Sequence, residues 1–142
     1  MALRTKPAAW FWVVSAILLL WNLMGFAAFL MEAVAPELLI ETFNEDQLAM
    51  YNDRPSWYMY NFAIAVFAGT LSCIFLFLRK KFAITLAVIS LLAVIISSIY
   101  TVYSGALDFV TTSDKILFYM VLILDVVLVF FARYATKRNW LN

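Results

Sequence analysis

Four long apolar segments, separated by short polar stretches, dominate the hydrophobic pattern of the chain. They cover about residues 8–31, 56–78, 82–103 and 116–134. Each holds roughly 19–24 residues, which as an α-helix measures about 29–36 Å and matches a hydrocarbon core of about 30 Å. Strands of a membrane barrel would alternate polar and apolar side chains, and these segments do not. The pattern predicts a single domain over residues 1–142, an all-α integral membrane four-helix bundle.

The longest polar stretch, residues 34–55, separates the first two apolar segments. Within it, Thr42-Phe-Asn-Glu45 matches a capping box, in which Thr42 is the N-cap and Glu45 lies three residues later. Pro55 prevents a helix from continuing into the second apolar segment. The sequence therefore predicts a short helix over about residues 43–52.

Basic residues lie almost entirely at one end of the predicted bundle. The chain has ten of them, and only Arg54 and Lys115 fall at the other end. The remaining eight flank the segments on one side: Arg4, Lys6, Arg79, Lys80, Lys81, Arg133, Lys137 and Arg138. The acidic residues outside the fourth segment all fall on the opposite side: Glu32, Glu37, Glu41, Glu45, Asp46, Asp53, Asp108 and Asp114. The positive-inside rule then predicts that both termini are cytoplasmic and that the short helix is extracytoplasmic.

Composition narrows the class of function. The chain is 66% hydrophobic and 13% charged, whereas a soluble domain is about half apolar and a quarter charged. It has no histidine, the commonest metal ligand and general base, and its single cysteine cannot form an intrachain disulfide. No glycine-rich phosphate loop is present. We therefore expect no enzyme activity, no metal or cofactor and no nucleic-acid partner, and we expect the lipid bilayer as the environment.

Small residues indicate how the helices pack. Transmembrane helices approach each other through such residues. The second segment carries Ala65, Gly69 and Cys73 at four-residue spacing, the third carries Ala93 one turn before a serine, and the first carries Gly25. We expect close contact between the second and third segments, which a short basic turn connects into an antiparallel hairpin.

Asp125 is the candidate for chemistry, because it lies in the middle of the fourth apolar segment. An aspartate at the bilayer centre costs about 2.5–3.5 kcal/mol on insertion scales and is a functional candidate by default. Counting about 1.5 Å per residue from the inner end places it about 15 Å deep. Thr70 and Ser90 then lie at about 12 Å, and Asn22 and Ser97 at about 21 Å. We expect Thr70 or Ser90 as direct partners, and Asn22 and Ser97 in the same polar track.

Three roles for Asp125 follow from this position. No lysine or arginine lies at its depth, so the carboxyl group is expected to be often protonated and hydrogen-bonded. Such a group suits a proton-coupled carrier, a structural hydrogen bond between helices, or contact with a basic residue of a partner protein. The sequence leaves these alternatives open.

Several short segments resemble a known group of proteins. They are Leu-Trp-Asn-Leu-Met-Gly at 20–25, Pro-Ser-Trp at 55–57, Phe-Ala-Ile-Ala-Val-Phe-Ala-Gly-Thr-Leu at 62–71 and Leu-Arg-Lys-Lys at 78–81. With the four-span arrangement, they resemble small bacterial inner-membrane proteins of uncharacterised function, some of which carry the label "sugar transporter". The resemblance implies a bacterial cytoplasmic membrane and assigns no catalytic or binding residue.

Two functions are compatible with these features. One is a small transporter, proton-linked or for a small solute, in which Asp125 handles the proton and Asn22, Thr70 and Ser97 line the path. Four spans without an internal repeat provide little room for alternating access, so a transporter is expected to be oligomeric. The alternative is an accessory or structural subunit that binds another membrane protein or lipid.

Overall fold

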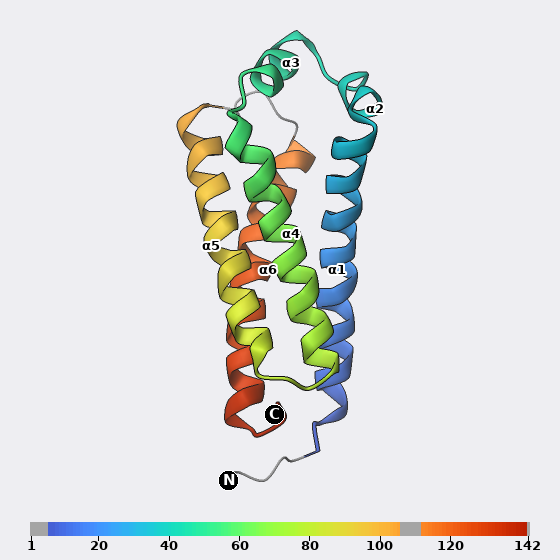
Figure 1. Ribbon diagram of the computed structural model, residues 1–142, viewed down its shortest axis with the longest axis vertical. Helices are drawn as coiled ribbons and strands as arrows, with labels where there is room; N and C mark the ends of the chain where they lie inside the picture. Colours follow the sequence, from blue (N-terminus) through green and yellow to red (C-terminus); the bar gives the residue numbers. More distant parts are fainter. Residues whose placement is uncertain (1–5, 106–111, 142) are drawn as a thin grey trace.

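The computed structural model describes residues 6–105 and 112–141, and across these residues the regular structure is entirely helical (Figure 1). Arg4 and Asp108, two of the charges in the topology argument, lie outside this part. The helices are α1 (Ala9–Val34), α2 (Pro36–Ile40), α3 (Glu45–Asn52), α4 (Ser56–Phe77), α5 (Phe82–Tyr103) and α6 (Thr112–Lys137).

Four of these helices, α1, α4, α5 and α6, are long and apolar enough to cross a membrane. At most 33% of the residues in the most apolar stretch of each are buried within the chain. Most apolar side chains therefore face outward, which is unfavourable in water and expected in lipid. The prediction of an all-helical bundle with four membrane-spanning segments is confirmed at this level.

Two helices extend beyond their predicted ends. α1 continues to Val34 and α6 covers Thr112–Lys137, whereas the apolar segments were 8–31 and 116–134. Hydropathy marks the part of a helix that lies in lipid, and polar residues can continue the helix past it. α1 ends where Pro36 begins α2, because proline disfavours the helical conformation in the residue before it.

The cap of α3 differs from the predicted one. Asn44, not Thr42, is the N-cap: its side chain accepts from the Gln47 backbone N–H at 2.8 Å, and the Gln47 side chain accepts from the Asn44 N–H at 3.2 Å. The Thr42 hydroxyl instead donates to the Leu39 carbonyl at 2.7 Å. The predicted cap was wrong because the turn after α2, which the sequence did not predict, engages the threonine.

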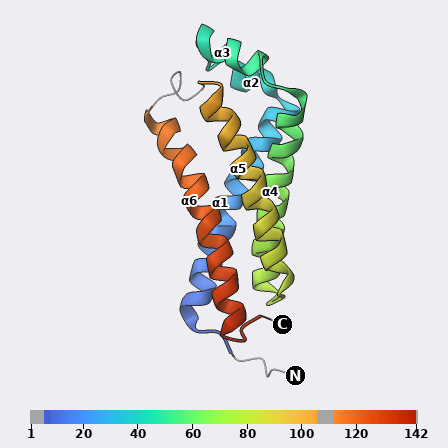
Figure 2. The same cartoon turned by 90° about the vertical axis from the view of Figure 1, so that its left-hand side faces the viewer.

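The long helices pack in the order α1, α4, α5, α6, and the α4–α5 hairpin has the most extensive contact, as predicted (Figure 1). Both helices bury small or short side chains: Ala68, Gly69, Ser72 and Cys73 from α4, and Ala83, Ala87, Ser90 and Ala93 from α5. Arg79 closes the turn with a positive φ of 58°. α1 and α6 contact each other much less, and Figure 2 shows them together at the lower end and apart at the upper end.

The lower half of the bundle, near the α4–α5 turn, is closed by a packed core. We call it the closed half, and its buried residues are Phe11, Leu18, Cys73, Leu76, Ala83, Ala87, Leu128, Phe131, Ala132, Ala135, Trp140 and Leu141. Rings of Trp10, Phe11, Phe131 and Trp140 pack with centroids 5.3–5.9 Å apart. Arg79 Nε donates to the Trp140 carbonyl at 2.9 Å, which fixes the segment after α6 beneath the bundle.

The upper half, which we call the open half, is packed differently along α6. Among the described side chains of residues 112–124, none is buried, and Asp125 is the first buried residue of the helix. Below it, Leu128, Phe131, Ala132 and Ala135 are all buried. Asp125 thus marks the level at which α6 enters the bundle.

Candidate functional site

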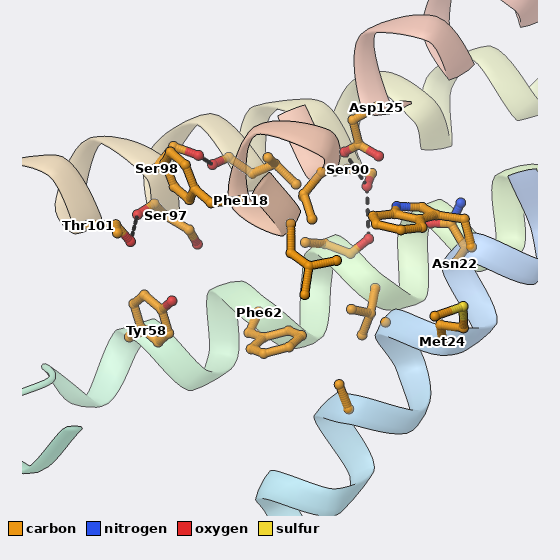
Figure 3. Close-up of a pocket in the computed structure, with 18 residues that line it drawn as sticks. Asn22, Met24, Tyr58, Phe62, Ser90, Ser97, Ser98, Thr101, Phe118 and Asp125 are labelled. Atoms are coloured by element: carbon orange, nitrogen blue, oxygen red, sulfur yellow. Dashed lines mark hydrogen bonds between the residues drawn. The ribbon is translucent and has the colours of Figure 1, made fainter. Parts of the chain in front are cut away.

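A cavity of about 420 Å³ lies between the four long helices in the open half (Figure 3). Asp125 of α6, Ser90 of α5 and Asn22 of α1 line its end nearest the closed half, which we call the floor (Figure 3). Its walls are mainly apolar and aromatic, and include Trp21, Tyr58, Phe62, Leu117 and Phe118. Ser97, Ser98 and Thr101 of α5 line the part nearer the upper end.

Among the described residues that line the cavity, Asp125 is the only charged one, and it is only 5% exposed. Its Oδ2 lies 3.0 Å from the Ser90 hydroxyl. In the part of the chain that the structure describes, this carboxyl group has no salt-bridge partner, since the ion pair found there joins Arg54 and Glu32. A buried carboxyl group with one hydrogen bond and access to a cavity is available for a proton or a ligand.

Ser90 links Asp125 to a third helix. Its hydroxyl lies 2.8 Å from the Ala65 carbonyl and 3.0 Å from Asp125 Oδ2 (Figure 3). A hydroxyl has one proton, so it donates to one of these acceptors at a time. If it donates to Ala65, the carboxyl group must carry a proton and donate to Ser90. If the carboxylate is ionised, Ser90 donates to Asp125 instead.

Asn22 and Gly69 form the adjoining contact between α1 and α4. Asn22 Nδ2 donates to the Leu18 carbonyl at 2.8 Å and approaches the Cys73 sulfur at 3.5 Å. Its Oδ1 lies against Gly69, where a Cβ atom would overlap it and would also lie 3.1 Å from Ser90 Oγ. Gly69 was predicted as a packing residue, and the structure places it where the floor requires the absence of a side chain.

The upper polar residues bond mostly to backbone. Asn61 Nδ2 donates to the Ala93 carbonyl at 2.7 Å and also bonds the Ser97 hydroxyl. Ser98 and Thr101 each donate to a carbonyl of their own helix four residues earlier. The cavity therefore contains polar side chains at both levels without a continuous chain of bonds between them.

The structure brings four of the five predicted polar residues, Asn22, Ser90, Ser97 and Asp125, to one cavity. Thr70 does not line it, and its hydroxyl instead lies 3.5 Å from the Asn22 carbonyl. The expectation that Thr70 could contact Asp125 was wrong, because equal depth on two helices does not imply that the side chains face each other.

The aromatic walls were not predicted from the sequence. Tyr58 lines the cavity together with Phe62, one turn further along α4. Both lie on the same helical face as Ala65 and Gly69, at spacings of four, seven and eleven residues from Tyr58. This stripe could have predicted the aromatic walls, because the face that packs against neighbouring helices also faces the interior.

Arg54 joins the upper end of the bundle to the cavity wall. It pairs with Glu32 in the last turns of α1, and its guanidinium lies 4.3 Å from the Tyr51 ring centroid and 4.7 Å from that of Tyr58. Cation–π contacts of this kind contribute about 0.5–2 kcal/mol. The pair therefore positions Tyr58 relative to α1, an arrangement that was not predicted from the sequence.

Comparison of the chain with protein-family models, with curated proteins and with solved structures finds no match. Among the residues that the structure describes, no group of three or more histidine, cysteine or acidic side chains could hold a metal ion. The cavity and Asp125 are therefore the features of the molecule that bear on its function.

Proposed function

We propose that the protein is a small membrane transporter, linked to protons or carrying a small solute, that acts as an oligomer. The observation that supports this is a buried carboxyl group at the floor of a cavity of about 420 Å³, near the middle of a membrane-spanning helix. Intramembrane carboxyl groups that face a cavity are typical of proton relays and substrate sites.

The orientation is part of the proposal. The basic residues of the α4–α5 turn and of the end of α6 lie at the lower end, which the positive-inside rule assigns to the cytoplasm. Both termini are then cytoplasmic, and α3 and the cavity lie in the extracytoplasmic half. The resemblance to small bacterial inner-membrane proteins favours the bacterial cytoplasmic membrane.

The Ser90 bridge suggests how a proton changes the site. With a proton on Asp125, the carboxyl group donates to Ser90 and Ser90 donates to Ala65. When the proton leaves, Ser90 turns to the carboxylate, and the charge becomes available to the cavity. An oligomer supplies a surface against which the upper part of α6, with no buried side chain among those described there, can pack.

The first experiment is flux through the purified protein in liposomes with a trapped pH-sensitive dye. We expect Asp125→Asn to remove proton flux that depends on the protein, because the amide cannot exchange a proton at this level. Asp46→Asn is the matched control, since that carboxyl group is exposed on α3. Equal flux in the wild type and in folded Asp125→Asn would exclude the proton-linked function.

The accessory role is the second candidate, and the same unburied upper part of α6 favours it. Its large side chains, which include Ile116, Leu117 and Tyr119, are about half exposed and could pack against another membrane protein. Native mass spectrometry after gentle extraction separates the two functions. A second protein at fixed stoichiometry supports the accessory role, and a homo-oligomer without one supports the transporter.

A further inference from the structure

The cavity has the chemistry of a site for an organic cation. Its volume of about 420 Å³ falls within the usual range for small-molecule sites, about 300–1,000 Å³. Among the described residues that line it, the one charged side chain is an aspartate and none is basic. A positively charged group at the floor would therefore meet an opposite charge and no repulsion.

The walls match the apolar part of such a ligand. Trp21, Phe62 and Phe118 line the cavity, and Tyr58 lines it nearer the upper end. Aromatic rings attract cations through their faces and pack against hydrocarbon through the same surface. A sugar would need many hydrogen-bonding side chains, whereas Ser98 and Thr101 already donate to their own helix.

Asp125 can accept further hydrogen bonds from a ligand. Ser90 is its only hydrogen-bond partner among the described residues, and it engages Oδ2. An ionised carboxylate accepts several hydrogen bonds, so an ammonium group can donate to Oδ1 while Ser90 donates to Oδ2. Ser90 then leaves Ala65, as it does when the carboxyl group loses its proton.

We infer that the cavity binds amphipathic organic amines, with the ammonium group on Asp125 and the apolar body against Trp21, Phe62 and Phe118. The inference rests on the proposed function, because it names the substrate class of the same site. Binding changes the charge of Asp125. Its protonated carboxyl group releases a proton to solvent, and the carboxylate that forms pairs with the ammonium group of the ligand.

Binding should therefore depend on pH. Cys73 of α4 interacts electrostatically with Asp125 but does not line the cavity. Among the described residues that line it, Tyr58 of α4 and Asp125 of α6 are the titratable ones, and α1 and α5 contribute none. Over the range in which Asp125 is protonated in the free protein, affinity for the amine should rise about tenfold per pH unit.

The test uses three probes with the same apolar body: phenylbutylamine, phenylbutanol and phenylbutyrate. Each is titrated calorimetrically into the full-length protein in lipid nanodiscs, with empty nanodiscs as background and buffers of different ionisation enthalpy to count released protons. We expect the amine to bind about tenfold or more tightly than the alcohol, because of the charge-assisted hydrogen bond, and the carboxylate to bind least. Equal affinities of amine and alcohol would overturn the inference.

Variants locate the site. Asp125→Asn should reduce amine affinity to that of the alcohol, and Phe62→Leu should weaken both probes alike, because both place a phenyl group there. Asp46→Asn should change neither. If Asp125→Asn does not fold, the wild-type order of the three probes and the proton release decide the question. Amine affinity that stays at the wild-type value in folded Asp125→Asn contradicts the inference.

Failure of this inference can be separated from failure of the proposed function. Amine binding with proton release, but no flux in liposomes, supports the site and contradicts the transporter. Proton flux that requires Asp125, without preference for the amine, supports the transporter and overturns the substrate class.

Discussion

The closed and open halves of the bundle contain similar apolar residues but pack in opposite ways. In the closed half, Ala132 and Ala135 allow α6 to approach the other helices, and Leu128 and Phe131 fill the space between. In the open half, residues 116–124 of α6 are all large, without one small residue. Helices in lipid approach closely only where side chains are small. Hydrophobicity therefore keeps all four helices in the membrane, and the size of their side chains decides where a cavity remains.

Matched truncations on α6 test this comparison most strongly. Leu128→Ala should lower the free energy of unfolding by about 2–4 kcal/mol, because Leu128 is fully buried and its removal leaves a cavity. Leu117→Ala should cost less than about 1 kcal/mol, since Leu117 is 47% exposed and already lines a cavity. Unfolding in detergent, followed by circular dichroism, measures both. Equal losses would mean that the open half is as well packed as the closed one.

Two glycines provide the second test. Gly69→Ala should destabilise the protein by about 1–3 kcal/mol, because the new Cβ overlaps Asn22 Oδ1 and crowds Ser90. Gly25→Ala should change stability by less than about 0.5 kcal/mol, because its Cβ would lie at an ordinary 3.7 Å from Val66. Thermal unfolding measures the change in stability of both variants. A stable Gly69→Ala protein would show that α1 and α4 can separate at this level.

Two buried serines give the smallest expected changes in stability, with opposite signs. Ser90→Ala should lower stability by about 1–2 kcal/mol, because Asp125 loses its hydrogen-bond partner. Ser15→Ala should raise stability by a few tenths to about 1 kcal/mol, because the Ser15 hydroxyl is fully buried and has no hydrogen-bond partner in the described part of the chain. The midpoint of chemical denaturation reports both. A loss in Ser15→Ala would indicate a partner such as bound water.

The sequence predicted the fold better than the site. Long apolar runs and small residues depend on composition and spacing alone, and they were sufficient for the four spans and the α4–α5 hairpin. Depth along a helix is likewise a matter of counting, so Ser90 was expected near Asp125. Rotation about the helix axis cannot be obtained by counting residues. Thr70 was therefore expected beside Asp125, although the preceding residue, Gly69, is the one that faces the floor. The cavity depends on the relative positions of all four helices, which no single segment specifies.

Because Ser90 shares one proton between two acceptors, the protonation state of Asp125 can be detected at a residue of another helix. Whenever the carboxyl group of Asp125 changes its charge, the hydroxyl must turn, and the Ala65 carbonyl on another helix gains or loses a hydrogen bond. A hydrogen bond lowers the stretching frequency of a carbonyl group, so an isotope label at Ala65 would give the infrared spectrum a reporter of events at Asp125. The carbonyl band of Ala65 on α4 would thus report the protonation state of Asp125 on α6.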